Sequence, residues 1–529
     1  MLPPASWPRG AVVAMGLVAS LFLAACSSII SPSPGDADAT PRQLQITVID
    51  AATGGPIGAA DLTVGSAEGV PTDASGHVVV QAVPGAAVEA VAEGHDPTRS
   101  SVPRAGDLVL SMRPNVVSGA VTDDAGLPLP GVRVFVDGAT AYVTTDQGGR
   151  YRLSGVPEQG TLVYKMPGRR LGLIPIDAAT TRNVTLPTFT ARALYAPASV
   201  FERSGRLDEM LALVDRTEVN AIVMDVKEAS GKLYWVTDLP AAKAVGSVMT
   251  QPLLDLETLL PQLKARGIYT IARMVVMKDN TLGNARPELA VRNATTGEPW
   301  RDNGGAIWLD PFSPDVAEYI AALATDLADK GFDEVQLDYV RFYSDGDYAA
   351  AQTKLPNTQS FRLPAMRRFF RVVSAALATK RAFLAADVFP ISFIASDDQG
   401  IGQRPEVVMP YVDYFSPMVY PSHYAKGTFG FAVPNDHPYE VIDSTLRLMN
   451  RESSGLRMVI RPWIQDFGIG GAAPYTAAQV LAEMKAASDN GAMGWMIWNA
   501  RARFTEMALG GPLAGEDAGP VTSAAPSGS

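Results

Sequence analysis

The pattern of apolar and polar residues changes near residue 190. Beyond it, short apolar runs predict β-strands at 193–198, 221–227, 268–276, 334–340, 382–389, 414–420, 458–465 and 494–499. Between these runs, apolar residues recur at helical spacing and predict helices at 205–216, 255–266, 314–330, 361–380, 439–451 and 476–490. Such an alternation of strands and helices is typical of a parallel sheet.

The number of strand–helix units separates two parallel-sheet folds. About eight units over residues 189–509 predict an α/β fold of the TIM type, a closed (β/α)8 barrel. An open doubly wound sheet is the alternative. No glycine-rich phosphate-binding loop follows any predicted strand, and this favours the barrel.

Residues 43–188 show a shorter, two-residue alternation interrupted by turn sequences, which is typical of β-strands. The turn sequence TDASGH at 72–77 returns as TDQGGRY at 145–151, a period of about 73 residues. We therefore predict two small all-β sandwich domains, a first sandwich at 43–113 and a second sandwich at 114–188. Nothing in either segment has catalytic spacing.

The N-terminal segment has the pattern of an export signal. Arg9 precedes an apolar run over 11–22, which is too short to span a bilayer and is followed by Leu-Ala-Ala at 23–25 and then Cys26. The sequence around Cys26 resembles a bacterial lipobox, which implies that residues 1–25 are removed and that Cys26 carries a lipid. An ordinary cleaved signal with an incidental cysteine is the alternative. Residues 26–42 would then be a disordered tether, and we expect an extracytoplasmic protein of the cell envelope, anchored to a membrane.

Composition excludes several classes of function. The chain has 529 residues and a formal net charge of −11, which argues against a nucleic acid partner. Its four histidines lie far apart, and its one cysteine excludes an intrachain disulfide. We expect no cofactor and no metal, and a monomer. The tail at 510–529, rich in Gly, Ala, Ser and Pro, is predicted to be disordered.

Charged, amide and aromatic residues gather at the ends of the predicted barrel strands. Because the carboxyl ends of barrel strands meet at one rim, these side chains are expected to converge there. Aromatic faces, hydrogen-bonding groups and a pair of carboxylates are the mixture that a sugar-cleaving site requires. The candidates are Asp225, Lys227, Arg273, Lys278, Asp279, Asp338, Arg341, Asp387, Tyr420, His423, Gln465, Asp466, Trp498 and Asn499.

Each of these residues could instead have a purely structural role. Asp338 ends an apolar strand and could be a helix cap or half of a structural salt bridge. Asp225 and Lys227 share a strand face and could pair with each other. Asp387 could be a buried acceptor, and His423 could cap its loop. Trp308 and Trp498 could be core residues, not sugar platforms.

Six segments of the barrel resemble the bacterial putative glycosyl hydrolase barrel domain, a family distantly similar to the α-amylase and melibiase barrels. In order along the chain they are 220–227, 271–279, 332–342, 387–389, 416–424 and 461–466. Residues 117–121, 130–134 and 149–153 of the second sandwich resemble the carboxypeptidase-regulatory-like fold, which implies a spacer or a weak carbohydrate-contacting module.

The barrel resemblance implies that Asp338, at the end of the fourth strand, is the nucleophile. Related barrels place the acid on the fifth or sixth strand, often as Glu, whereas this sequence offers Asp387 on the fifth and only Tyr420 and His423 on the sixth. Asp387 is therefore the first candidate for the acid, with Asp466 and Asp225 as the others. Arg273 is expected to support Asp338 as a carboxylate.

The sequence thus predicts a lipid-anchored extracytoplasmic glycoside hydrolase that cleaves a cell-envelope or environmental polysaccharide with two carboxylates. Such a pair lies about 5–5.5 Å apart in retaining enzymes and about 6.5–9.5 Å apart in inverting ones. A non-catalytic polysaccharide-binding or scaffold lipoprotein on a degenerate barrel is one alternative. A divalent-metal hydrolase using Asp225, Asp338 and Asp387 is another, although no tight ligand motif supports it.

Overall fold

A computed structural model describes residues 40–469, 474–512 and 519–524. The predicted signal peptide, Cys26 and nearly all of the predicted tether lie outside these residues. The chain forms two compact units. The first comprises most of the first sandwich, and the second contains the second sandwich together with the barrel.

The first unit is a sandwich of two sheets, with strand orders β4-β1-β7 and β3-β2-β5-β6, in which β4 pairs with β1 antiparallel and the second sheet is antiparallel throughout. Along β1, Leu44, Ile46 and Val48 are buried and alternate with more accessible residues, as expected for a strand with one face against a core. The strands are β1 (Arg42–Asp50), β2 (Asp61–Val64), β3 (Ala67–Pro71), β4 (His77–Ala82), β5 (Ala87–Val91), β6 (Thr98–Ser101) and β7 (Leu108–Met112).

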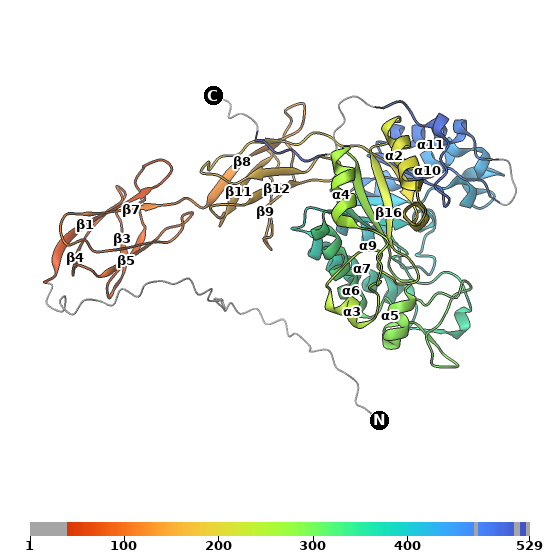
Figure 1. Cartoon of the computed structure of the whole chain (residues 1–529), viewed down its shortest axis with the longest axis horizontal. Coiled ribbons are helices and arrows are strands. Elements are labelled where there is room, and N and C mark those ends of the chain that lie inside the picture. Colours follow the sequence, from red (N-terminus) through yellow and green to blue (C-terminus); the bar gives the residue numbers. More distant parts are fainter. Residues whose placement is uncertain (1–39, 470–473, 513–518, 525–529) are drawn as a thin grey trace. The chain divides into compact units, whose positions relative to one another are not determined.

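The second sandwich repeats this scheme with sheets β10-β9-β12-β13 and β11-β8-β14. The repeat extends to single contacts, since the hydroxyls of Thr72 and Thr145 donate to the carbonyls of Ile57 and Leu129 respectively. The strands, several of which are labelled in Figure 1, are β8 (Val116–Thr122), β9 (Arg133–Val136), β10 (Val143–Thr144), β11 (Arg150–Ser154), β12 (Thr161–Lys165), β13 (Gly172–Pro175) and β14 (Val184–Thr185).

Part of the C-terminal tail is ordered against this sandwich, so the prediction of a fully disordered tail is wrong. Val521 donates its amide to the Leu171 carbonyl and accepts from the Leu173 amide, both at 2.7 Å. Arg170 donates to the carbonyl of Gly519. Backbone pairing with a sheet edge needs no apolar side chains, which explains why composition did not reveal it.

The barrel is a ring of parallel strands, as the sequence predicts. The sheet order is β23-β22-β21-β19-β17-β16-β15-β25-β24, and every described pairing within it is parallel. The strands are β15 (Ala191–Ala196), β16 (Ala221–Lys227), β17 (Tyr269–Val275), β19 (Glu334–Asp338), β21 (Phe383–Val388), β22 (Tyr414–Pro417), β23 (Val459–Ile460), β24 (Trp463–Gln465) and β25 (Gly494–Trp498).

The two end members, β23 and β24, are pieces of one interrupted strand. The break falls at Pro462, which has no amide to donate to a ladder. On one side of the break, β23 pairs with β22, and on the other, β24 pairs with β25. Met418 also bridges Trp463 in parallel, so the interrupted strand contacts both neighbours and the ring closes with eight strands.

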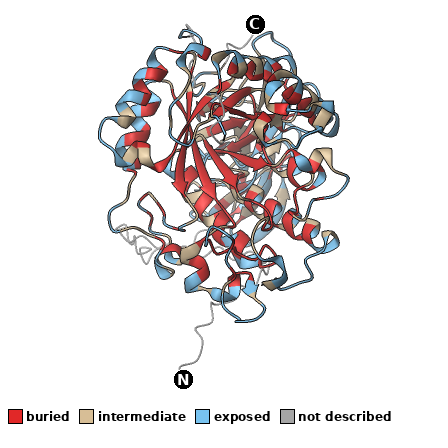
Figure 2. Cartoon of the chain, turned by 90° about the vertical axis from the view of Figure 1, so that its right-hand side faces the viewer, coloured by how far each residue is buried: buried red, intermediate tan, exposed pale blue. Residues whose placement is uncertain are grey.

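Helices enclose this ring, and Figure 2 shows buried strands surrounded by helices that are exposed on their outer sides. Pro314 starts α6 at its first position and Gly331 ends it with φ +107°, a conformation that suits glycine. The longer helices are α2 (Arg206–Asp215), α4 (Leu256–Ala265), α6 (Pro314–Lys330), α7 (Gln359–Leu377), α10 (Pro438–Glu452) and α11 (Ala477–Asp489). The shorter ones are α1 (Ala198–Glu202), α3 (Pro240–Ala244), α5 (Asn280–Ala285), α8 (Ile391–Ile394) and α9 (Pro405–Val408).

None of the helices in the described ranges is long and apolar enough to cross a bilayer.

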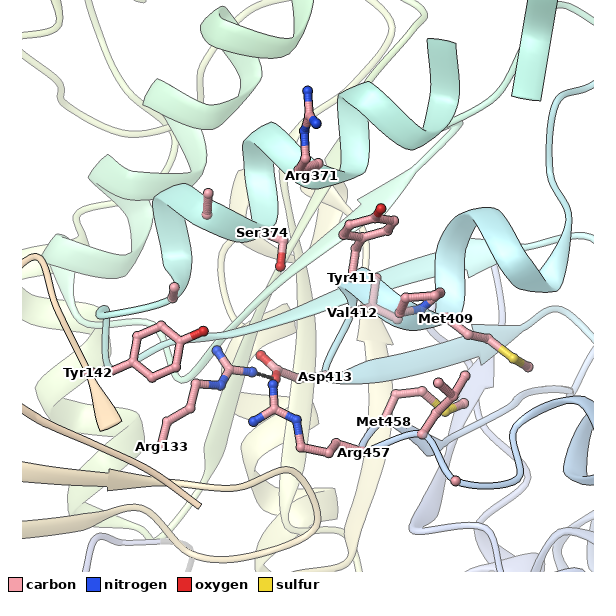
Figure 3. A pocket seen from close by; sticks show the side chains of 15 residues that line it. Arg133, Tyr142, Arg371, Ser374, Met409, Tyr411, Val412, Asp413, Arg457 and Met458 are labelled. Carbon is pink, nitrogen blue, oxygen red and sulfur yellow. Dashed lines mark hydrogen bonds and ion pairs between the residues drawn. The ribbon is translucent and has the colours of Figure 1, made fainter. Parts of the chain in front are cut away.

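The second sandwich is fixed to the amino-terminal end of the barrel strands. Lys165, at the end of β12, is fully buried and donates to the carbonyls of Leu377, Lys380 and Ala382. The Leu377 carbonyl ends α7, where the last carbonyls have no partner within the helix. Arg133 of the sandwich forms an ion pair with Asp413, just before β22 (Figure 3).

Replacing Lys165 by alanine should lower the free energy of unfolding by about 3 kcal/mol, because three buried carbonyls and the nearby Asp413 lose their cationic partner. Urea denaturation monitored by tryptophan fluorescence measures this change. The exposed Lys243, replaced in the same way, should alter stability by less than about 0.5 kcal/mol. Equal effects of the two substitutions would contradict the prediction.

Candidate active site

The centre of the site is the guanidinium of Arg273, which points into the barrel from β17. It forms ion pairs with Asp225 of β16 and Asp338 of β19. Its Nε lies 4.0 Å from Oδ2 of Asp387 on β21. The three carboxylates on adjoining strands therefore surround an arginine. No cluster of three or more metal-binding side chains is found in the described part of the chain.

A second layer holds this arrangement in place. Tyr195 of β15 donates its hydroxyl to Asp225 and stacks on Trp498 of β25, with ring centroids 4.0 Å apart. Arg273 lies over both rings. Burial raises the pKa of Asp225 to about 6, although Arg273 and Tyr195 act in the opposite direction. Asp225 is fully buried behind Arg273, so it supports the arginine.

Asp338 lies at the point where β19 ends in a sharp turn. The next residue, Tyr339, has φ +51°, which is uncommon for a residue other than glycine. This conformation lets the Tyr339 amide donate to Oδ1 of Asp338 at 2.6 Å. The carboxylate is thus held on both oxygens, by its own backbone on one side and by Arg273 on the other. Strained backbone of this kind gathers at functional sites.

Asp387 has a different environment, although it lies in the same cavity. Its Oδ1 accepts from the indole of Trp463 at 2.7 Å, and its buried Oδ2 has no hydrogen-bond partner among the described residues. Burial, and then the charge of Asp338, raise the pKa of Asp387 well above its usual range. The protonated form of Asp387 is therefore favoured more strongly than that of an exposed aspartate.

A cavity of about 590 Å³ opens at the carboxyl ends of the strands and contains both Asp338 and Asp387. Its wall combines charged groups with aromatic and aliphatic side chains, which suits a sugar ring with one apolar face and several hydroxyls. Seven predicted residues line it: Arg273, Asp338, Arg341, Asp387, Tyr420, His423 and Trp498. Burial raises the pKa of Tyr420 well above its usual range and lowers that of His423, so both are neutral at pH 7.

Other predicted residues lie outside the cavity and bind one another. Lys227 does not pair with Asp225 but lies 3.0 Å from Asp279, and both are fully buried. Asp279 also caps α5 through the amide of Leu282. Lys278 forms an ion pair with Asp302 at 2.6 Å. Asp225 and Lys227 therefore each have a partner, but not the one that strand alternation suggested.

The residues predicted after the seventh and eighth strands also bind protein groups and do not line the cavity. Asp466 accepts from the amide and the hydroxyl of Thr505. Gln465 accepts from Ser422, and Asn499 donates to the Asp466 carbonyl.

Sequence reasoning missed the two aromatic residues that bind the carboxylates directly. Trp463 lies in the segment 461–466 and donates to Asp387, and Tyr195 lies on the first barrel strand and donates to Asp225. Strand alternation places Trp463 on the same face as Gln465, and it could have suggested an inward position. Trp308, one of the open cases, is a fully buried core residue.

A second cavity, of about 410 Å³, lies at the opposite end of the barrel strands, next to the second sandwich (Figure 3). Arg133, Arg371 and Arg457 line it, and its one carboxylate, Asp413, is bound to Arg133. A cavity without a second carboxylate offers no acid–nucleophile pair.

The family of the barrel follows from its sequence. Residues 193–504, more than half of the chain, match the model of the putative glycosyl hydrolase domain. The chain belongs to this family. Residues 116–188 match the carboxypeptidase regulatory-like domain. The resemblances predicted from sequence motifs are thus confirmed for the glycosyl hydrolase domain and for the second sandwich.

Among curated proteins, the chain is 36% identical over 70 residues to TonB-dependent receptor P39 of Formosa agariphila. That match covers 13% of this chain and 7% of the receptor, so the chain spans only a small part of this relative.

Solved structures that are similar to this chain include a hypothetical protein from Ruminiclostridium thermocellum. It is 29% identical over 37% of this chain and 97% of its own, with a TM-score of 0.32. The PgaB glycoside hydrolase domain of Bordetella bronchiseptica is 14% identical over 59% of this chain and 95% of its own, with a TM-score of 0.44. The catalytic domain of a Paenibacillus polymyxa β-amylase is 10% identical over 63% of this chain and 95% of its own, with a TM-score of 0.40.

Replacing Asp387 by asparagine should stabilise the folded protein at pH 7 by ~1–2 kcal/mol, a common size for a stabilising substitution, because a neutral amide avoids the free-energy cost of keeping this ionisable group buried. Because the folded-state pKa of Asp387 is raised, the wild type loses stability as pH rises from the unfolded value of about 3.9 through the folded value. Asparagine has no such loss, so the two proteins should approach each other in stability near pH 4. Thermal unfolding between pH 4 and pH 8 measures the difference. A variant less stable than the wild type at pH 7 would contradict the raised pKa.

Proposed function

We propose that the chain is an extracytoplasmic glycoside hydrolase that cleaves a polysaccharide with Asp338 and Asp387, and that a lipid on Cys26 anchors it to a membrane. One observation carries the catalytic part of this proposal. Two carboxyl groups line a single cavity, yet one is ion-paired with Arg273, whereas the other is buried, has one oxygen without a hydrogen-bond partner among the described residues, and has a raised pKa. A pair of carboxyl groups in such opposite states is what glycoside hydrolysis requires.

In the first step, Asp387 donates its proton to the glycosidic oxygen while Asp338 attacks the anomeric carbon. The carbon–oxygen bond to the leaving sugar breaks, and a glycosyl ester forms on Asp338. In the second step, the Asp387 carboxylate takes a proton from water, which attacks the anomeric carbon and releases Asp338. Trp463 holds Oδ1 of Asp387, which leaves Oδ2 to carry the proton.

Arg273 acts as a positioning residue for this pair. Its ion pairs with Asp225 and Asp338 fix the attacking carboxylate, and its own fully buried support, Tyr195 hydrogen-bonded to Asp225, limits its movement. Trp498 stacks on Tyr195 and lines the cavity, where its ring can lie against the apolar face of a sugar.

Replacing Asp338 by asparagine should reduce turnover at least about 10³-fold, because asparagine cannot form the glycosyl ester under these conditions. Release of new reducing ends from a panel of cell-wall and capsular glycans measures turnover. The variant should fold normally, since asparagine can still accept the Tyr339 amide. The exposed Asp238, changed to asparagine, serves as the matched control and should leave turnover intact.

Two outcomes would change this assignment. Full activity of the Asp338 variant would exclude it as the nucleophile, and glycan binding without turnover in the wild type would indicate a binding protein on a degenerate barrel. Parallel asparagine variants of Asp387 and Asp466 identify the acid, because loss of the true acid should reduce turnover by about 10²–10⁴. Loss of turnover in the Asp466 variant alone would identify Asp466, and not Asp387, as the acid.

The anchor is supported by the sequence Leu-Ala-Ala-Cys after a short apolar run. Replacing Cys26 by alanine should move the protein from the membrane fraction to the soluble extracytoplasmic fraction, since no lipid can then be attached. Fractionation of cells that express both forms, followed by mass spectrometry of the N-terminal peptide, measures this. A membrane-bound alanine variant, or an unmodified Cys26, would refute the lipid anchor.

A further inference from the structure

Arg341 is a buried cation in the wall of the catalytic cavity. It follows β19, three residues after Asp338, and only 5% of its surface is exposed. Its guanidinium lies over the rings of Trp308, Tyr339 and Phe389, at 5.1, 5.2 and 4.6 Å from their centroids. The rings fix its plane at the edge of the space in which Asp338 and Asp387 face the substrate.

The hydrogen bonds of Arg341 use only one of its nitrogens. Nη1 donates to the Phe342 carbonyl at 3.0 Å and to the Ser344 hydroxyl at 2.7 Å. Within the described ranges, Nε and Nη2 make no hydrogen bond, and Arg341 forms no ion pair with a carboxylate. One edge of the guanidinium, with two donors, is therefore available to a molecule in the cavity.

The other buried arginines in the described part of the chain differ in this respect. Arg273 pairs with Asp225 and Asp338, Arg362 with Asp398, and Arg461 with Glu334. A guanidinium without a carboxylate partner is unfavourable in a buried position, and aromatic rings replace that partner only in part. Arg341 is thus the buried arginine that has no carboxylate within ion-pair distance among the described residues, although Asp338 and Asp345 act on it from further away.

The remaining charges of the cavity leave Arg341 as its available cation. Arg273 is already bound to carboxylates, and the lowered pKa of His423 keeps that ring neutral. The neighbouring wall is formed by Phe389, Ile391 and Ile394, which offer no polar group from their side chains. Among the residues that line the cavity, Arg341 is therefore the cation that can bind a negatively charged substituent on a sugar.

We propose that the free edge of Arg341 binds an anionic group on the sugar next to the cleaved bond, and that the substrate is an acidic polysaccharide. The inference rests on the proposed function, because it takes this cavity to be the substrate site. Two parallel donors, Nε and Nη2, suit the paired oxygens of a carboxylate or a sulfate. The substrate class is therefore a polymer that bears uronic acid or sulfated sugars.

The test compares polymers that differ only in their charged groups. Polygalacturonate, alginate and hyaluronate are each paired with their carboxyl-reduced forms, and dextran sulfate is paired with dextran. Affinity electrophoresis and calorimetry measure binding to the wild type, which requires no turnover. At least one acidic polymer should bind about tenfold or more tightly than its neutral partner, since a charge-assisted hydrogen bond contributes this much. The carboxylate and sulfate arms distinguish the two kinds of anion.

Variants then assign the preference to a residue. Arg341→Gln should remove the difference between acidic and neutral forms, and Arg341→Lys, which keeps the charge without the two-donor edge, should retain part of it. Arg371→Gln is the matched control, because this exposed arginine lies on α7 in the other cavity. Thermal unfolding checks that each variant is folded, and the wild-type comparison stands even if one is not.

Equal binding of acidic and neutral forms by the wild type would overturn the inference, as would a preference that survives Arg341→Gln or a failure to bind any acidic polymer. These failures differ from failure of the proposed function. If the wild type turns over a neutral polymer, Asp338→Asn abolishes this turnover and no acidic polymer is preferred, the proposed hydrolase function would stand. The inference of an acidic substrate would then be wrong. If the protein prefers acidic polymers through Arg341 but turns over no polymer, the inference of an acidic ligand would stand and the proposed hydrolase function would be wrong.

Discussion

The ion pairs of Arg273 are the interaction on which the rest of the site depends. One guanidinium joins the carboxylates of Asp225 and Asp338 and lies 4.0 Å from that of Asp387, so its position affects all three. A barrel is needed for this, because only the closed ring of parallel strands brings β16, β17, β19 and β21 together at one rim. Without the cation, three acids in one buried space would repel each other, and the site would not form with its present charges.

The same arrangement gives two similar side chains different properties. Asp338 accepts from Arg273 and from a backbone amide, whereas Asp387 accepts from a neutral indole and leaves one oxygen without a partner among the described residues. Burial and the charge of Asp338 raise the pKa of Asp387 by more than Arg273 and Trp463 lower it. The difference between an ion-paired carboxylate and a carboxyl with a raised pKa therefore comes from the neighbours that each strand end supplies. It does not come from the identity of the residues, which are both aspartates.

Much of this arrangement can be predicted from the sequence, and the remaining features cannot be predicted for physical reasons. Hydrophobic periodicity predicts β16 and α6 to the residue, because it reports which face is buried. Strand ends predict that Asp338 and Asp387 share a rim. Periodicity cannot say which partner a charged side chain binds, so the sequence leaves a pair of Lys227 with Asp225 open, whereas Lys227 binds Asp279. It also cannot reveal contacts made by backbone alone, such as those of Val521, or a donor like Trp463 that reaches across the barrel.

The buried lysine of β12 has a consequence for how long polymers reach the enzyme. Lys165 binds the second sandwich to the amino-terminal ends of the strands, and the cavity that contains Asp338 and Asp387 opens at their carboxyl ends. The second sandwich therefore lies on the opposite side of the barrel from the entrance of this cavity. A carbohydrate that enters this cavity therefore meets the loops of the rim and not the second sandwich.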